Sequence, residues 1–277
     1  LRDWADDTAS VVEALGISRP VHLVGWSTGG AAIGCYAIDR PDSVASLTFI
    51  DPVSPYGYGG TRGPDGVPNF ADFAGSGGGT GNQDFAAAIA AGDRGTESEL
   101  SPRSVMRTSY WSPDYRVDPD WEDVLVDEVL LSVTGDDGYP GDATPSDNWP
   151  GFAPGTRGIL NALSGKYCNW SGILELDPKP PVLWTHGTGD IVVADGSPWD
   201  IGTLGQMGVV PGWPGEEAFP PQPMVTQIRA LMQRYADAGG DVTMRMFPDS
   251  GHGPMIDAAG DWMSVFFEFL DRVAGDR

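Results

Sequence analysis

The feature that most restricts the fold of this chain is a serine placed between a short apolar run and a helix-prone stretch. Residues 21–34 read Val-His-Leu-Val-Gly-Trp-Ser-Thr-Gly-Gly-Ala-Ala-Ile-Gly, with Ser27 at the centre of a Gly-x-Ser-x-Gly pattern. A strand that turns sharply into a helix holds such a serine in strained geometry, and small residues two positions on either side let strand and helix approach. The turn lifts the hydroxyl clear of the sheet, where backbone N–H groups face a developing oxyanion. The pattern therefore predicts that Ser27 is a nucleophile.

The sequence around this motif alternates between helical and strand patterns, which is typical of a parallel sheet with helices on both faces. Residues 3–15 place apolar side chains at helical spacing, and Pro41 ends the helix that follows Ser27. The predicted fold class is therefore α/β, with a mostly parallel sheet. The predicted elements are helix 3–15, strand 21–26, helix 28–40, strand 46–50, strand 181–186, helix 224–238, strand 242–247 and helix 255–273.

Residues 54–178 interrupt this alternation. The segment is rich in Gly, Pro and Trp, and it shows no strong strand alternation. Short helical patterns occur near 84–91, 101–110 and 119–133. We therefore expect an inserted lid of small helices over the rim of the sheet, while residues 1–53 and 179–277 form the α/β core.

The charge of the chain restricts its partners. Of its 277 residues, 39 are acidic and 16 are basic, which gives a formal net charge of −23. Such a surface repels nucleic acid and anionic membranes, so neither is expected as a partner.

The chain has no apolar run long enough to cross a bilayer and no visible signal segment, so we expect a soluble protein. The sequence does not determine the cellular compartment, although the cytoplasm is favoured, and it does not determine the oligomeric state. The acidic surface suggests adaptation to high salt concentration.

Cysteine and histidine usage gives no support for a metal or cofactor. The two cysteines, Cys35 and Cys168, are too few for a disulfide-rich scaffold or a zinc site built from Cys alone. Cys35 is expected in the core, and a disulfide between the two is the less favoured alternative. Because the chain has no His-Glu-x-x-His pattern and no His/Cys cluster, no metal and no cofactor is expected.

A serine hydroxyl is a weak nucleophile near neutral pH and needs an adjacent base. The chain offers three histidines. His22 lies within the strand before Ser27 and is expected to be structural, while His186 lies at a strand end, where a packing role is favoured. His252 lies in a glycine-flanked loop after a strand, the position at which open α/β sheets place their ligands. His252 is therefore the predicted base.

The base needs a carboxylate that orients it and stabilises the imidazolium. Asp190 follows a predicted strand by the turn Gly-Thr-Gly-Asp and precedes His252, which gives the order Ser, Asp, His that this motif requires. Asp51, after the strand over 46–50, is the alternative acid. The other interpretation of Asp51 is a loop-capping residue before Pro52.

Three local patterns together resemble the α/β-hydrolase superfamily. They are Gly-Trp-Ser-Thr-Gly-Gly at 25–30, Gly-Thr-Gly-Asp at 187–190 and Gly-His-Gly-Pro-Met at 251–255. The resemblance covers about 1–53 and 180–275. The motif around the serine looks like those of esterases, lactonases, C–C bond hydrolases and cofactor-free haloperoxidases, and it argues against members that carry Asp at this position.

The resemblance implies a role for each matching residue. Ser27 would be the nucleophile, Asp190 the triad acid and His252 the base. The backbone N–H of Thr28 would supply half of the oxyanion hole. Trp26, beside the serine, is a candidate for the substrate pocket, together with aromatic residues of the expected lid. Those residues are Tyr110, Trp111, Trp149 and Trp170. For each of these lid residues taken singly, packing of the lid onto the core is the favoured interpretation.

Two departures from the family pattern stand out. Members of the family normally have several strands before the helix with which this chain begins, and one of their early loops supplies the second oxyanion donor. That donor is therefore expected upstream of Leu1, and the isolated chain is expected to have an exposed sheet edge. The interval from Asp190 to His252 is also long, because a Pro/Gly/Trp-rich loop occupies 194–223.

The resemblance and the residues lead to one main functional prediction. We expect a serine hydrolase that cleaves an ester or a lactone through an acyl-enzyme, without a cofactor. The alternatives on the same residues are a C–C bond hydrolase or a haloperoxidase-type perhydrolase. A further alternative is a non-catalytic ligand-binding homologue or an inactive fragment.

Overall fold

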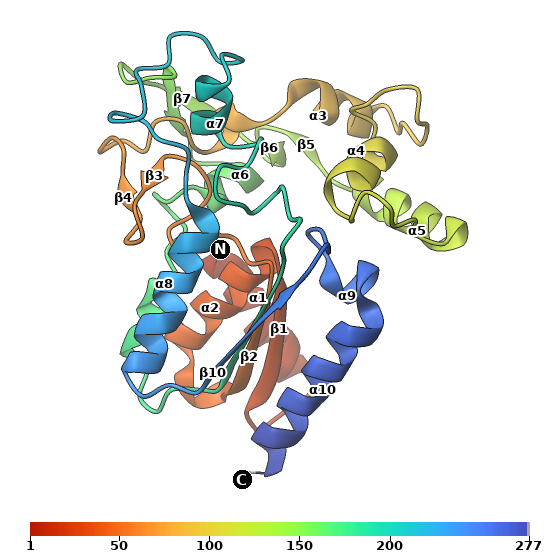
Figure 1. Ribbon diagram of the computed structural model, residues 1–277, viewed down its shortest axis with the longest axis vertical. Helices are drawn as coiled ribbons and strands as arrows, with labels where there is room; N and C mark the ends of the chain where they lie inside the picture. Colours follow the sequence, from red (N-terminus) through yellow and green to blue (C-terminus); the bar gives the residue numbers. More distant parts are fainter. Residues whose placement is uncertain (276–277) are drawn as a thin grey trace.

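Short runs rich in β-branched and aromatic residues form a central parallel sheet. The computed structural model describes residues 1–275 and gives the sheet the strand order β1-β2-β9-β10. The strands are β1 (Val21–Trp26), β2 (Val44–Ile50), β9 (Val182–Gly187) and β10 (Val242–Phe247). All three pairs of neighbouring strands are parallel, so the four carboxyl ends lie at one edge of the sheet (Figure 1). The predicted α/β fold class is confirmed.

Helices cover both faces of this sheet, as predicted (Figure 1). The helices of one face are α1 (Arg2–Ala14), α2 (Thr28–Asp39) and α8 (Met224–Asp237), and α10 (Ala259–Gly275) covers the other. Neighbouring residues of β9 point to opposite faces, as the pleat of a strand requires. Leu183 packs with Phe269 of α10, while Trp184 belongs to the core cluster that contains Ile228 of α8. The two central strands, β2 and β9, are therefore buried on both sides, which explains their largely apolar sequence.

The predicted elements of the core are observed with boundaries that differ by one or two residues, except near the C-terminal end. The single helix expected over 255–273 is two helices, α9 (Pro254–Asp257) and α10. Between them, Ala258 leaves the helical region with φ −127° and ψ 34°. This break separates the end of the His252 loop from the long helix that packs on the sheet.

Between β2 and β9 the chain forms many short elements. The helices are α3 (Gln83–Ala90), α4 (Pro102–Ser109), α5 (Pro119–Leu130) and α6 (Ile159–Leu163), and α7 (Ile201–Gln206) follows β9. The strand pairs are β3 (Thr61–Arg62) with β4 (Val67–Pro68), β5 (Thr134–Gly135) with β6 (Tyr139–Pro140), and β7 (Ala143–Pro145) with β8 (Phe152–Pro154). Short 3-10 helices occur at Pro41–Ser43, Gly78–Thr80 and Ser171–Glu175. The sequence predicted the helices α3 to α5 but missed the strand pairs.

The last part of the expected lid packs into the main core instead. The ring of Trp170 stacks on Phe49 of β2 with 4.9 Å between ring centroids, and its Nε1 donates to the carbonyl of Val53 at 3.2 Å. Ile173 lies in the same buried cluster. Trp170 is therefore a core residue, as the packing interpretation expects, and it does not line a substrate pocket.

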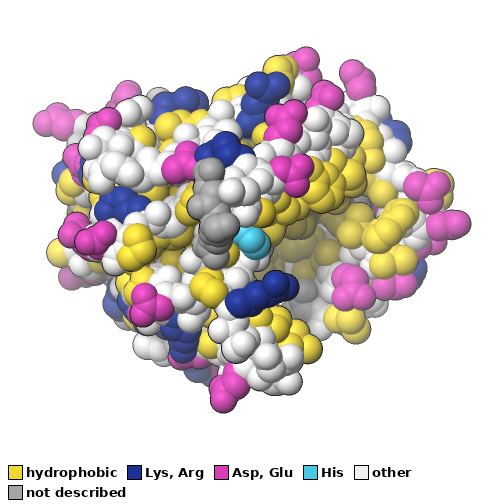
Figure 2. Space-filling view, turned by 90° about the horizontal axis from the view of Figure 1, so that it is seen from below, with side chains coloured by type: hydrophobic (Ala, Val, Ile, Leu, Met, Phe, Trp, Pro, Cys, Tyr) yellow, Lys and Arg dark blue, Asp and Glu magenta, His cyan; other side chains and the backbone are white. Residues whose placement is uncertain are grey.

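One edge of the sheet is open in the described chain. Within residues 1–275, β1 pairs with β2 alone. Val24 on β1 is 46% exposed and Phe267 on α10 is 57% exposed. Apolar side chains also line a hollow on the lower face of the molecule (Figure 2). The exposed edge that the sequence predicted is thus present in the structure.

Two further sequence expectations concern residues away from the sheet edge. Cys35 and Cys168 are both free and both buried, so the alternative of a disulfide between them is wrong. Across residues 1–275, none of the helices combines the length and the apolar character that a membrane span needs.

Candidate active site

Ser27 stands in the sharp turn between β1 and α2. Its φ is 52° and its ψ is −117°, a conformation that non-glycine residues rarely adopt and that costs roughly 1–3 kcal/mol. The Ser27 N–H donates to the carbonyl of Ile50 at 2.9 Å, and the Val53 N–H donates to the carbonyl of Ser27 at 3.1 Å. Hydrogen bonds to β2 and to the residues after it therefore hold the strained serine in place.

The glycines of the motif do not all serve the same purpose. A Cβ atom on Gly25 would lie 2.3 Å from the carbonyl oxygen of Gly29, so strand and helix could not approach as they do. A Cβ on Gly30 would lie 2.6 Å from Cβ of Pro52, whereas a Cβ on Gly29 would meet nothing within 4 Å. The sequence predicts a need for small residues two positions on either side of Ser27. The structure shows that need at Gly25 and not at Gly29. The second close approach is at Gly30.

The backbone beside the serine offers a hydrogen-bond donor. Thr28 is the first residue of α2, so its N–H has no acceptor within the helix. The positive end of the helix dipole lies at the same position. The side chain of Ser27 makes no capping hydrogen bond to the helix, which leaves its hydroxyl available for chemistry.

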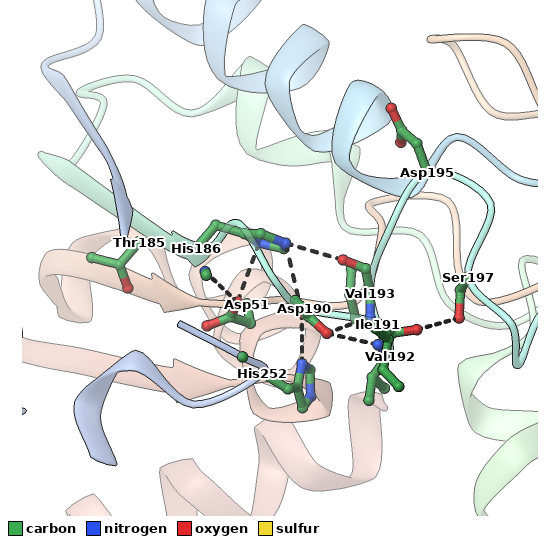
Figure 3. Close-up of polar contacts among 12 residues, drawn as sticks. Asp51, Thr185, His186, Asp190, Ile191, Val192, Val193, Asp195, Ser197 and His252 are labelled. Carbon is green, nitrogen blue, oxygen red and sulfur yellow. Dashed lines mark hydrogen bonds and ion pairs between the residues drawn. The ribbon is translucent and has the colours of Figure 1, made fainter. Parts of the chain in front are cut away.

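Asp190 and His252 meet at the carboxyl edge of the sheet (Figure 3). Nδ1 of His252 lies 2.8 Å from Oδ2 of Asp190, and the two residues are only 2% and 6% exposed. The other carboxylate oxygen, Oδ1, accepts from the N–H groups of Val192 and Val193 at 2.7 and 3.0 Å. Burial alone would raise the pKa of Asp190, but the charge and hydrogen bond of His252 hold that pKa below its usual value. Asp190 is therefore an ionised carboxylate aimed at the imidazole.

Asp51, the alternative acid, lies beside this pair in a different environment. It follows β2, is fully buried, and accepts from the N–H of Gly187 through Oδ1 at 2.8 Å. Burial, and then the negative charge of Asp190, raise the pKa of Asp51 well above its usual value. Two neighbouring buried carboxyl groups thus have opposite tendencies, with Asp190 charged and Asp51 favouring the neutral acid.

His186 lies between the two carboxyl groups (Figure 3). Its Nδ1 is 3.6 Å from Oδ1 of Asp51, and its Nε2 is 3.6 Å from Oδ2 of Asp190. Nε2 is also 3.0 Å from the carbonyl of Val193, which can only accept, so the ring carries its proton on Nε2. Burial lowers the pKa of His186 to about 4, so the ring is neutral near neutral pH. Sequence reasoning assigned this histidine a packing role and missed its place between the acids; its position at a strand end was the available signal.

Aromatic side chains surround His252. The indole Nε1 of Trp26 donates to the carbonyl of His252 at 2.6 Å, and the Trp26 ring stacks on that of Trp111. Tyr110 packs edge-on against both Trp26 and His252. Trp149, by contrast, packs against Phe219. Of the aromatic residues suggested for a pocket, Trp26, Tyr110 and Trp111 lie at the site and Trp149 lies elsewhere.

The structure brings some of the candidate residues together and separates others. Asp190, His252 and Asp51 form one buried cluster, and their possible ligand atoms lie within 4.8 Å of one another. Two carboxylates and an imidazole are donors that a divalent ion accepts. Nδ1 of His252 and Oδ2 of Asp190, however, already form a direct contact with each other. His22 lies apart from this cluster, where its Nδ1 contacts Oγ of Ser46.

Comparison with known sequences supports a specific family. A sequence profile described as "Alpha/beta hydrolase family" matches residues 1–264. Part of the chain is similar to the bifunctional esterase/perhydrolase DCH of Acinetobacter calcoaceticus, with 44% identity over 66 residues. This match spans 24% of the chain and 24% of that enzyme, so it is a local similarity.

Solved structures share the fold. A "putative aryl esterase" from Burkholderia cenocepacia matches with a TM-score of 0.51 and 16% identity, over 99% of this chain and 72% of that one. The carboxylesterase CesB from Bacillus subtilis matches with a TM-score of 0.50 and 14% identity, over 97% of this chain and 66% of that one. At such identities the likeness is one of fold.

Proposed function

The chain belongs to the alpha/beta hydrolase family, and on that premise we propose that it is a serine hydrolase that cleaves a carboxylic ester or a lactone. The observation that carries the proposal is the 2.8 Å contact between Nδ1 of His252 and Oδ2 of Asp190. This pair is buried at the sheet edge where Ser27 stands in a strained turn. A base with a charged orienting acid, at the same sheet edge as an available hydroxyl, is the arrangement that nucleophilic acyl transfer needs.

In the proposed reaction, the hydroxyl oxygen of Ser27 attacks the carbonyl carbon of the substrate. His252 takes the hydroxyl proton on Nε2 and returns it to the leaving alcohol, while Asp190 holds the ring and stabilises the imidazolium. The backbone N–H of Thr28 donates to the oxyanion. Water, deprotonated by His252, then attacks the acyl-enzyme and frees Ser27.

The side chains around His252 support an apolar substrate group. Trp26, Tyr110 and Trp111 lie next to His252 with their rings in contact. Aromatic side chains supply large apolar contact areas at ligand sites. We therefore expect esters with an apolar acyl or alcohol part to be better substrates than small, charged ones.

Perhydrolysis is a second candidate on the same residues. The local similarity to an esterase/perhydrolase favours it. In perhydrolysis, hydrogen peroxide replaces water as the group that attacks the acyl-enzyme, and a peracid leaves in place of a carboxylic acid. The first half of the reaction, up to the acyl-enzyme on Ser27, is unchanged.

The proposal can be tested with a fluorophosphonate probe, which labels an activated serine. We expect the wild-type protein to be labelled at Ser27 and to hydrolyse p-nitrophenyl butyrate, while Ser27→Ala loses both properties. Ser10→Ala, on the exposed side of α1, is the matched control and should behave as wild type. Peracid formation from the same acyl group with added hydrogen peroxide would identify perhydrolysis. A correctly folded wild-type protein that is neither labelled nor active on any ester would overturn the proposal.

A further inference from the structure

The loop that carries His252 lies against a segment from a distant part of the chain. Residues 110–112 follow α4, and they contact the loop 250–253 between β10 and α9. A Cβ atom on Gly251 would lie 2.7 Å from the carbonyl carbon of Trp111, and one on Gly253 would lie 2.5 Å from the Trp111 ring. In Figure 1 the loop before α9 comes up to the region of α4. Both glycines are therefore needed for this close contact.

A single carboxylate joins the two segments. Oδ2 of Asp257, at the end of α9, accepts from the backbone N–H of Ser112 at 2.8 Å and from that of Gly251 at 2.8 Å. Oδ1 of Asp257 accepts from the hydroxyl of Ser250. The Ser112 contact connects residues 145 positions apart, whereas the other two are local to the loop. Nothing in the proposed reaction uses Asp257.

The position of His252 depends on contacts from several sides. Asp190 fixes Nδ1 of the ring, and Trp26 donates to the backbone carbonyl. Asp257 fixes the N–H of the preceding residue, Gly251, and so controls the path of the backbone on the other side. The Asp257 carboxylate therefore holds both segments through three hydrogen bonds, from two backbone N–H groups and one hydroxyl.

We propose that Asp257 is a positioning residue that fixes the His252 loop to segment 110–112. The base then keeps its alignment only while this segment, with Tyr110 and Trp111, is seated beside it. The inference rests on the proposed function, because it assigns His252 the role of base. Asp257 acts through the loop and does not touch the reacting atoms. Small displacements of a catalytic group, of the order of 1 Å, can lower a rate by about 10²-fold.

Two substitutions at this position separate geometry from charge. Asp257→Ala removes all three acceptor contacts. In Asp257→Asn the amide oxygen can still accept from Ser112 and Gly251, and the amide nitrogen can donate to the Ser250 hydroxyl. We expect Asp257→Ala to lower kcat for p-nitrophenyl butyrate by about 10- to 100-fold with KM changed less than about threefold. Asp257→Asn should stay within about threefold of wild type, and so should Asp261→Ala, an exposed control on α10.

Ser250→Ala covers the case in which Asp257→Ala does not fold. It removes the hydroxyl contact alone, so its kcat should fall in the same direction by a smaller factor. A loss in Asp257→Asn as large as that in Asp257→Ala would overturn the proposal, because it would mean that the charge matters and the hydrogen-bond geometry does not. A wild-type kcat in folded Asp257→Ala would overturn it as well.

Amide hydrogen exchange tests the connection without any activity. In Asp257→Ala we expect faster exchange in two separate peptides, one covering 107–116 and one covering 249–253, and unchanged exchange in helix α8. Faster exchange in 249–253 alone would show that Asp257 supports only its own loop, which overturns the link to segment 110–112. If the wild-type protein turned over no ester, the proposed function would fail, while the exchange result would still decide whether Asp257 holds the two segments together.

Discussion

At the scale of single residues, the two buried acids at the sheet edge show that position in the sequence does not determine protonation. Asp51 and Asp190 both follow strands of the same parallel sheet, and both are almost fully buried. Asp190 faces His252 and two backbone N–H groups, which favour its charged form. Burial, and then the negative charge of Asp190, raise the pKa of Asp51, and its single N–H donor does not offset them. Local donors and charges, which depend on tertiary contacts, separate the two.

This difference predicts unequal effects of removing each charge. Asp190→Asn should lower kcat for p-nitrophenyl butyrate by about 10³- to 10⁴-fold, because the amide cannot stabilise the imidazolium of His252. Asp51→Asn should stay within about fivefold of wild type, since an amide replaces a group that favours the neutral acid. Steady-state kinetics on both variants, with melting temperatures to confirm folding, measure the contrast. Equal losses in the two variants would show that Asp51 shares the role of the acid.

A third buried acid, Asp200, predicts a pH-dependent stability. It is 1% exposed at the N-terminus of α7, and its Oδ2 accepts from the N–H groups of Thr203 and Gln222. Burial raises the pKa of Asp200 to about 6. In the unfolded chain that pKa is about 3.9, so the fold favours the protonated acid, and stability is lost as the pH rises from about 4 through 6. The loss is about 3 kcal/mol for about two pKa units.

Asp200→Asn should therefore raise the melting temperature clearly more at pH 8 than at pH 4.5. His186 acts in the opposite sense: its pKa of about 4 in the fold lies below the unfolded value, so its contribution is lost as the pH falls from about 6.5 to 4. The His186 contribution cancels when variant and wild type are compared at the same pH. Asp261→Asn, at an exposed position, serves as the control. A gain of the same size at both pH values would contradict the argument.

At the scale of secondary-structure elements, the junction of β1 and α2 predicts opposite results for two similar substitutions. Gly25→Ala should destabilise the fold strongly, because its Cβ would lie 2.3 Å from the carbonyl oxygen of Gly29. Gly29→Ala should be neutral or stabilising by about 0.5–1 kcal/mol, since the site is open and alanine favours a helix. Urea unfolding of both variants gives the free energies. A lower free energy of unfolding in Gly29→Ala would mean that the first turn of α2 needs the backbone conformational freedom of glycine.

Some secondary-structure elements could be predicted from the sequence and others could not. The strands of the central sheet and helices α2 and α8 have long apolar patterns, and their bounds were predicted within one or two residues. Strands such as β3 (Thr61–Arg62) have two residues, too few for any periodicity to appear. The break at Ala258 was missed; Asp257, just before it, is bound to Ser112, which lies in another part of the chain. Elements that depend on distant contacts leave no local pattern.

At the scale of the whole molecule, the parallel sheet explains why the candidate site could largely be anticipated. The carboxyl ends of β1, β2, β9 and β10 lie at one edge, so the residues after those strands had to come close together. Ser27, Asp51, Asp190 and His252 all follow strand ends. His186 was seen but given a packing role, and Asp257 was not singled out, since their significance lies in side-chain contacts rather than in position.

The charge of the whole molecule leads to a final prediction about salt. Acidic side chains outnumber basic ones by 23, so most surface carboxylates repel one another in the folded state more than in the expanded chain. The screening length falls from about 30 Å at 0.01 M salt to about 3 Å at 1 M. The melting temperature should therefore rise steeply between 0.01 and about 0.3 M sodium chloride and then level off. A rise that continues linearly into the molar range would indicate general exclusion of salt from the surface instead. Equal melting temperatures at 0.01 and 1 M would show that self-repulsion does not limit the stability of this fold.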